Sequence, residues 1–161
     1  TTLFRSVLAE RLSGSYKMLH LPDGLSQDSL HMLMTCEPQI KEIGDLISRT
    51  DVLLFGIGTA MRMADQRHIA DDVRKQLVDN HAVGEALGQY CDIEGKLIYS
   101  TNNIGLSLPD VVKVPNVIAV AGGQEKASAI IGVMRACQKG ILIIDEQAAE
   151  GMRQLLQISA L

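Results

Sequence analysis

The sequence predicts an α/β fold with a parallel central sheet flanked by helices. Three apolar stretches, at residues 51–58, 116–121 and 141–145, are predicted to be its strands. They are almost uniformly apolar, without the alternation typical of a sheet with one exposed face. Short glycine joints follow two of them, and a helical pattern follows all three. We therefore expect one compact domain whose strands are buried on both faces.

The first 24 residues are predicted to form a helix and a short strand. Apolar residues at helical spacing predict a helix over residues 3–12, ending near Gly14. The strand covers residues 16–21 and leads into a turn at Pro22-Asp23-Gly24.

Two further helices are expected before the first apolar strand. Ser26 suits the N-cap of one, and Leu25 with Leu30 would form a hydrophobic staple across it. Pro38 suits the first turn of the other. Its inward face would comprise Ile40, Ile43, Leu46 and Ile47.

The middle of the chain is predicted to form two helices and a β-hairpin. The helices cover residues 59–67 and about 70–79. The hairpin covers residues 83–100, with its turn at 92–96.

The C-terminal part is predicted to alternate strand and helix. A loop containing two prolines precedes the strand at 116–121. A helix over 124–138 would bury Ala127, Ile130, Ile131, Met134 and Cys137. A closing amphipathic helix covers residues 146–156.

Composition excludes several classes of function. The formal net charge of −4 gives the surface no general attraction for DNA or an anionic membrane. No apolar run reaches the roughly 18 residues needed to cross a bilayer. The cysteines Cys36, Cys91 and Cys137 form no C-x-x-C pair, so neither a disulfide framework nor a zinc site is expected. They are predicted to be small core residues in a reducing cytoplasm.

Two predicted strands end in glycine joints, and these joints point to an anion site. The joints are Gly56-Ile57-Gly58 and Gly122-Gly123. Ligands of open α/β sheets bind at the carboxyl ends of strands, where glycine permits close approach. The helix that begins at Gln124 would offer free N–H groups to an anion. Lys126, in its first turn, opposes the helix dipole by about 0.3–1 kcal/mol unless an anion binds there.

Alternatives remain open for these residues. Gly122-Gly123 is equally a tight turn, and Lys126 a solvated side chain. Arg67 is a candidate for clamping a second anion, or a surface cation of a helix. Glu85 is a candidate acceptor of sugar hydroxyl groups, or a solvated hairpin residue.

Three stretches together resemble the effector-binding domain of SorC/DeoR-type transcriptional regulators. They are FGIGTAMRMADQR, DNHAVGEALGQYCDIEGK and PNVIAVAGGQEKASAIIGVMRACQKGILIIDEQAA. The resemblance covers nearly the whole chain and implies a fold similar to glucosamine-6-phosphate deaminase, ribose-5-phosphate isomerase and CoA-transferases. It implies a cytoplasmic repressor without a cofactor, which binds operator DNA as a dimer or tetramer. Its effector would be a phosphorylated sugar, fructose 1,6-bisphosphate in the members that control glycolytic genes.

The resemblance also implies roles for individual residues. Lys126 matches a lysine that contacts a sugar phosphate, and Glu85 matches a carboxylate that contacts sugar hydroxyls. The family has a short arginine-rich run where this chain has Asp65-Gln66-Arg67. The arginine role therefore falls on Gln66 or Arg67.

The resemblance leaves two elements of the family without a counterpart. They are the DNA-binding helix-turn-helix and an upstream Gly-Gly-Thr-Thr-like loop at a further phosphate site. We therefore expect residues 1–161 to be the C-terminal part of an effector-binding domain.

Two other functions fit the same architecture. One is a sugar-phosphate isomerase or deaminase, since fold alone does not fix function. The deaminase has an Asp-Gly-His where this chain has Thr59-Ala60-Met61, which removes a carboxylate for proton transfer and favours a sensor. The other is an oligomerisation module that binds no ligand.

Overall fold

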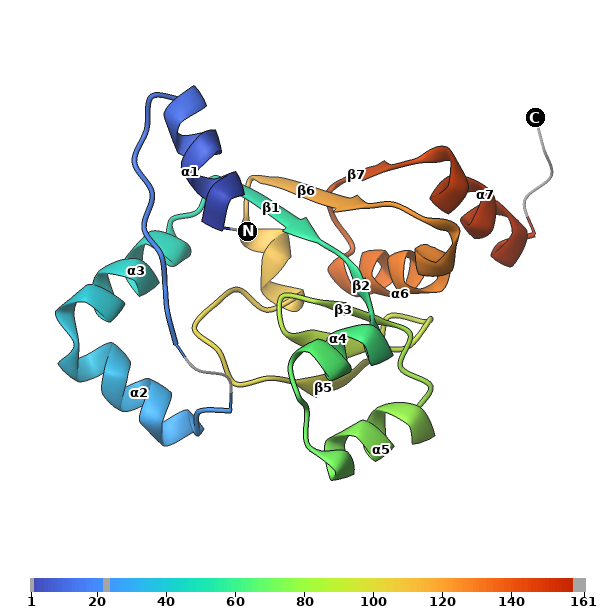
Figure 1. Cartoon of the computed structure of the whole chain (residues 1–161), viewed down its shortest axis with the longest axis horizontal. Helices are drawn as coiled ribbons and strands as arrows, with labels where there is room; N and C mark the ends of the chain where they lie inside the picture. The colour runs from blue at the N-terminus through green and yellow to red at the C-terminus, as the bar shows by residue number, and fades with distance from the viewer. Residues whose placement is uncertain (1, 22–23, 158–161) are drawn as a thin grey trace.

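The computed structural model describes residues 2–21 and 24–157, with side chains from residue 6 onward, and has the predicted α/β architecture (Figure 1). The α-helices are α1 (Thr2–Arg11), α2 (Gln27–Cys36), α3 (Pro38–Ser48), α4 (Ala60–Gln66), α5 (Asp71–Asp79), α6 (Ala127–Cys137) and α7 (Glu146–Leu155). The strands are β1 (Val52–Gly56), β2 (Gly58–Thr59), β3 (Gly84–Ala86), β4 (Gln89–Cys91), β5 (Leu97–Ser100), β6 (Asn116–Ala121) and β7 (Ile141–Ile144). Two 3₁₀ helices, η1 (Pro109–Lys113) and η2 (Gln124–Lys126), flank β6.

The three predicted strands form a parallel sheet in the order β1-β6-β7. One face of this sheet packs on α6, and the two together make the main hydrophobic core. Phe55 and Ala119 come from neighbouring strands of the sheet, and Ile130 and Val133 come from α6. The helix that connects two parallel strands thus covers the sheet it crosses, as expected for a βαβ unit.

The other face of the parallel sheet is exposed, so the prediction of strands buried on both faces is wrong. Five large apolar side chains on this face are between 42 and 64% exposed. They are Val52, Leu54, Val120, Ile141 and Ile143. The reason is that α6 covers one side only, while α4 and α5 pack against a second sheet. Apolar residues lie on both faces of the strands, but a helix covers only one face.

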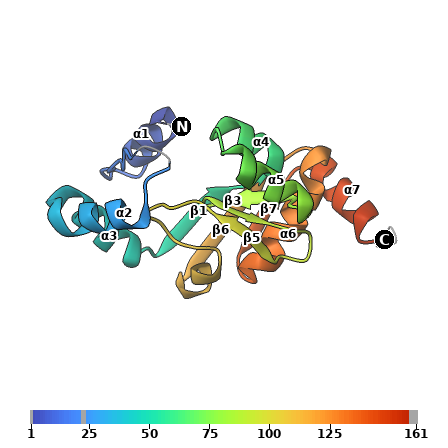
Figure 2. The same cartoon turned by 90° about the horizontal axis from the view of Figure 1, so that it is seen from below.

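The second sheet is antiparallel, in the order β2-β3-β4-β5, and was predicted only in part. The hairpin turn at residues 92–96 is confirmed: the Asp92 carboxylate accepts the N–H groups of Glu94 and Lys96. A second turn, at Leu87-Gly88, divides the first predicted strand into β3 and β4. This sheet lies between α4 and α6, which Figure 2 shows on opposite sides of the strands.

The N-terminal region agrees with the prediction in its helices and differs in its strand. Ser26 caps α2 by accepting the N–H of Ser29, and Pro38 begins α3. Residues 16–21 form no strand, because a strand needs a hydrogen-bonded neighbour and none of the described strands pairs with them. Pro22 and Asp23 lie outside the described residues.

Helix α3 and one of the three cysteines are less buried than predicted. No residue of α3 is fully buried, and Leu46 on its expected inward face is exposed. Cys91 and Cys137 are core residues, and burial raises their thiol pKa values to about 12 and about 11. Cys36 is exposed, so its assignment to the core is wrong.

Candidate functional site

The two glycine joints lie at the same edge of the parallel sheet. Strands β1 and β6 are neighbours, with Gly56 in register with Val120. The segments that leave them, Gly56-Ile57-Gly58 and Gly122-Gly123, therefore begin next to each other. This edge holds the carboxyl ends of the strands, where ligands of α/β sheets bind.

The second joint is fixed by Asp145, a residue that sequence reasoning missed. Asp145 is the N-cap of α7, and its carboxylate accepts the Ala148 N–H at 2.8 Å and the Gly123 N–H at 2.9 Å. These bonds, with the nearby charge of Lys126, lower the pKa of Asp145. A Cβ on Gly122 would lie 2.6 Å from Asp145 Oδ2, so the joint has no room for a side chain there. An acidic residue between a buried strand and a helix was the available signal.

Lys126 lies at the joint, although the α-helix begins three residues later than predicted. Gln124 to Lys126 form the 3₁₀ turn η2, and α6 starts at Ala127, which makes Lys126 the N-cap. Within the described part of the chain, its ammonium group makes no hydrogen bond or ion pair. A lysine held at a helix N-terminus in this way offers a charge to an anion.

Other groups at the joint restrict where an anion can bind. The Gly123 N–H donates to Asp145, so this group is not available to an anion, although Gly123 was expected to take part in ligand binding. The Glu125 carboxylate lies beside Gly123, since a Cβ there would be 2.5 Å from Glu125 Oε2. Gly123 has a φ of 96°, which favours glycine. Gln124 is exposed at the start of η2.

Glu85 is a buried carboxylate, and its interpretation as a solvated hairpin residue is wrong. The residue is 3% exposed, in the middle of β3. Its Oε1 accepts the Gly88 N–H at 2.7 Å and Arg67 Nη2 at 3.2 Å. Burial raises the pKa of Glu85, and the positive charge of Arg67 and the Gly88 N–H oppose that rise. The group is thus held in place by the turn of its own hairpin.

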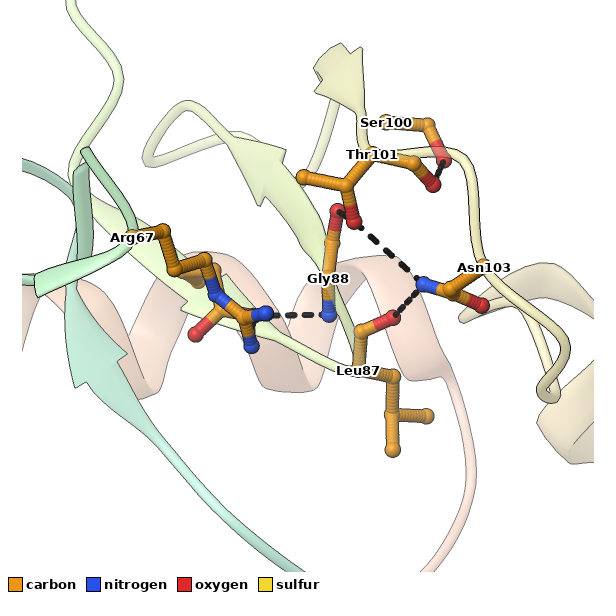
Figure 3. Close-up of polar contacts among 7 residues, drawn as sticks. Arg67, Leu87, Gly88, Ser100, Thr101 and Asn103 are labelled. Atoms are coloured by element: carbon orange, nitrogen blue, oxygen red, sulfur yellow. Dashed lines mark hydrogen bonds and ion pairs between the residues drawn. The ribbon is translucent and has the colours of Figure 1, made fainter. Parts of the chain in front are cut away.

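The surroundings of this turn are drawn in Figure 3. Leu87 and Gly88 both have positive φ, at 55° and 80°. Thr101 and Asn103, from the segment after β5, donate hydrogen bonds to the carbonyl oxygens of these two residues.

Arg67, and not Gln66, faces Glu85. Arg67 is the C-cap of α4, with its side chain 28% exposed, and it forms an ion pair with the buried carboxylate. Gln66 is the last residue of α4 and is exposed. The structure therefore brings Arg67 together with Glu85 and leaves Gln66 outside this contact.

Gly58 joins the two halves of the site. It pairs with Glu85 across β2 and β3, and β2 also lies against η2, which carries Lys126. A Cβ on Gly58 would lie 2.4 Å from Met63 Cγ, so a side chain there would displace Met63. The elements that carry Glu85 and Lys126, β3 and η2, thus both lie against β2.

Two further properties concern the described residues as a whole. Residues 2–21 and 24–157 contain no group of three or more His, Cys, Asp or Glu side chains arranged to hold a metal ion. None of the described helices is long and apolar enough to span a membrane.

Comparison with known proteins identifies relatives over most of the chain. Residues 3–154 match the sequence profile of the family described as "Putative sugar-binding domain". The central glycolytic genes regulators of Bacillus subtilis and Priestia megaterium are 36 and 38% identical over 143 residues, or 89% of this chain. The match covers 42% of each relative, so the chain spans about two-fifths of their length.

Solved structures give the same result for the fold. The "putative SorC family transcriptional regulator" from Enterococcus faecalis is 38% identical, with a TM-score of 0.82 over 91% of this chain and 60% of that chain. The full-length sorbitol operon regulator SorC from Klebsiella pneumoniae is 24% identical, with a TM-score of 0.73 over 89 and 47% of the two chains. The chain belongs to the sugar-binding domain family of SorC/DeoR-type transcriptional regulators.

Proposed function

We propose that this chain is the effector-sensing part of a bacterial transcriptional repressor and binds a phosphorylated sugar, with fructose 1,6-bisphosphate as the first candidate. One observation carries the proposal. Beside the adjoining ends of β1 and β6, strand β2 contacts both η2, whose Lys126 forms no ion pair with the described residues, and β3, which carries the buried Glu85 of the ion pair with Arg67. A cation and a hydroxyl acceptor on two elements that flank the same strand suit a ligand with a phosphate at one end and hydroxyl groups next to it.

The phosphate end of the ligand binds at the second glycine joint. Lys126 supplies the charge, and the backbone N–H groups at the start of η2 are the other donors. Charge-assisted hydrogen bonds contribute about 1.5–3 kcal/mol each. The Glu125 carboxylate must move away from Gly123, because two negative charges at this distance repel each other.

The sugar end of the ligand binds at Glu85. Oε1 already accepts two hydrogen bonds, while Oε2 lies 3.9 Å from the position of a Cβ on Gly58 and is the acceptor we assign to a sugar hydroxyl. The positive charge of Arg67 opposes the rise that burial causes in the pKa of Glu85, and Arg67 remains partly exposed, so it is the candidate contact for a second anionic group. Gln66 lies outside this contact, so it would contact the ligand only if α4 moved.

The regulatory consequence concerns the whole protein. The relatives are named as regulators of genes, so we assign operator binding to another part of the whole protein, and binding of the sugar phosphate would change how subunits of the regulator associate. Such a ligand shifts the equilibrium only by its difference in affinity for the two arrangements.

An enzyme is the second candidate, and Glu85 is the observation that favours it. A buried carboxylate with a raised pKa is a common general base. Its ion pair with Arg67 favours a binding role, because it stabilises the charged form without a substrate. Formation of a ketose, or release of ammonia, from aldose or amino sugar phosphates would establish the enzyme instead.

The proposal is tested by titrating the ¹⁵N-labelled chain with fructose 1,6-bisphosphate, fructose 6-phosphate and fructose. NMR detects weak binding, which matters for a chain that spans two-fifths of its relatives. We expect the amides of Gly122 to Lys126 and Gly88 to shift with both phosphates and not with fructose. Shifts of the same residues with fructose alone, or no shifts with any of the three, would contradict a phosphate-dependent sensor.

A further inference from the structure

The three residues that follow β5 contact two different parts of the molecule. Thr101 and Asn103 face the Leu87-Gly88 turn, as Figure 3 shows. Asn102, between them, faces α2: its Nδ2 donates to the Leu25 carbonyl oxygen at 3.0 Å, and its Oδ1 accepts from Gln27 Nε2 at 2.9 Å. Successive side chains of an extended chain point to opposite sides, so one short segment reaches both partners.

On the inner side, Thr101 and Asn103 determine the conformation of the turn. Gly88 O accepts from Thr101 N at 2.8 Å and from Thr101 Oγ1 at 2.9 Å, and Leu87 O accepts from Asn103 Nδ2 at 3.1 Å. Leu87 has a positive φ, which costs energy for a residue with a side chain, so the turn needs such bonds. In this conformation the turn presents the Gly88 N–H to the Glu85 carboxylate.

On the outer side, Asn102 connects the start of α2 to the rest of the domain. Helix α2 packs chiefly on α3, and a cavity of about 480 Å³ lies among α2, α3 and residues 103–106. Its walls include Leu30 and Met34 of α2 and Leu106 of the loop. Beside this space, the two hydrogen bonds of Asn102 connect the start of α2 to the segment that follows β5.

We propose that residues 101–103 position Glu85 and couple it to the α2–α3 helix pair. When Oε2 of Glu85 accepts a ligand hydroxyl, the carboxylate shifts, and the Gly88 N–H follows it. Thr101 and Asn103 move with the turn, and Asn102 transfers the displacement to α2. The ligand-dependent step rests on the proposed function, whereas the positioning of Glu85 does not.

The positioning role is tested without ligand by hydrogen exchange on four variants of this chain. Thr101→Val removes the hydroxyl donor at similar size, and Thr101→Ser restores it. Asn102→Ala breaks both bonds to α2. Asn116→Ala is the matched control, because Asn116 also bonds a backbone carbonyl, that of Asp51, far from the turn.

We expect Thr101→Val to speed exchange of the Gly88 amide roughly fivefold to tenfold, the effect of about one hydrogen bond, while Thr101→Ser stays near wild type. Asn102→Ala should speed exchange of the α2 amides by a similar factor and leave Gly88 unchanged. Asn116→Ala should change neither region. Unchanged Gly88 exchange in Thr101→Val, or unchanged α2 exchange in Asn102→Ala, would overturn the inference.

The coupling is tested by repeating the measurement with fructose 1,6-bisphosphate. We expect the ligand to slow exchange at Gly88 and in α2 of the wild type, but only at Gly88 in Asn102→Ala. Protection at Gly88 without any in α2 of the wild type overturns the coupling, as does equal α2 protection in both proteins. If neither region of the wild type responds, the proposed function and the ligand-dependent step both fail, and the ligand-free variants still decide the positioning role.

Discussion

Both carboxylate oxygens of Asp145 lie within hydrogen-bonding distance of the Gly123 N–H, at 2.9 and 3.1 Å. The bond connects the start of α7 to the glycine joint after β6. It also occupies a donor that an anion would otherwise use. Asp145 therefore determines the shape of the candidate phosphate site from outside it.

The first prediction separates the charge of Asp145 from its hydrogen bonds. Asn caps helices about as well as Asp, so Asp145→Asn should keep the melting temperature close to wild type, whereas Asp145→Ala should lower it. Losing the negative charge next to Lys126 should also strengthen phosphate binding in Asp145→Asn. Thermal unfolding and an NMR titration with inorganic phosphate measure the two effects. Weaker phosphate binding in Asp145→Asn would contradict the electrostatic part.

The second prediction compares the two glycine joints. A Cβ on Gly122 would lie 2.6 Å from Asp145 Oδ2, whereas one on Gly56 would meet only Val120 O at 3.9 Å, an ordinary contact. Gly122→Ala should therefore lower the melting temperature and shift the Gly123 amide resonance. Gly56→Ala should do neither. Equal effects of the two substitutions would show that the crowding at Gly122 is relieved by other movements.

The third prediction follows from the raised pKa of Glu85. Because its pKa is higher in the folded than in the unfolded chain, the group contributes stability at low pH that is lost as pH rises from about 4.5 towards the folded-state value. Glu85→Gln lacks this titration. Urea denaturation at pH 4 to 7 measures the unfolding free energy of both proteins. The stability of the wild type relative to Glu85→Gln should fall as pH increases. A difference moving the opposite way would mean that Arg67 outweighs burial.

The sequence predicted the elements well where a local signal determined them. Ser26 and Pro38 marked the starts of two helices, and the residues from 92 to 96 marked a hairpin turn. The sequence did not predict the features that depend on contacts between distant parts of the chain. Whether residues 16–21 become a strand depends on a neighbouring strand, and whether Ile141 is buried depends on a helix elsewhere in the chain.

The candidate site shows the same division. The glycine joints and Lys126 could be read from the sequence because a strand followed by glycine has a local signature. The contact between Arg67 and Glu85 joins residues 18 positions apart, so only the fold shows that Arg67 rather than Gln66 faces the carboxylate. Asp145 was readable as an N-cap, but its bond to Gly123 was not.

The fourth prediction concerns the open face of the parallel sheet. Ile143 is 52% exposed on that face, and Ile130 of α6 is fully buried on the other. Ile130→Ala should cost about 2–5 kcal/mol of unfolding free energy. Ile143→Ala should cost about 1 kcal/mol or less, the range of strand preferences. Equal losses in urea denaturation would show that the face is covered in solution.

The most direct measurement is an NMR titration of the wild type, Lys126→Ala and Lys75→Ala with fructose 1,6-bisphosphate. Lys75 is an exposed lysine of α5 and serves as the matched control for net charge. We predict that Lys126→Ala weakens binding by about tenfold to a hundredfold, the effect of one charge-assisted hydrogen bond, while Lys75→Ala binds like the wild type. Equal binding by Lys126→Ala and the wild type would contradict a phosphate site at this joint.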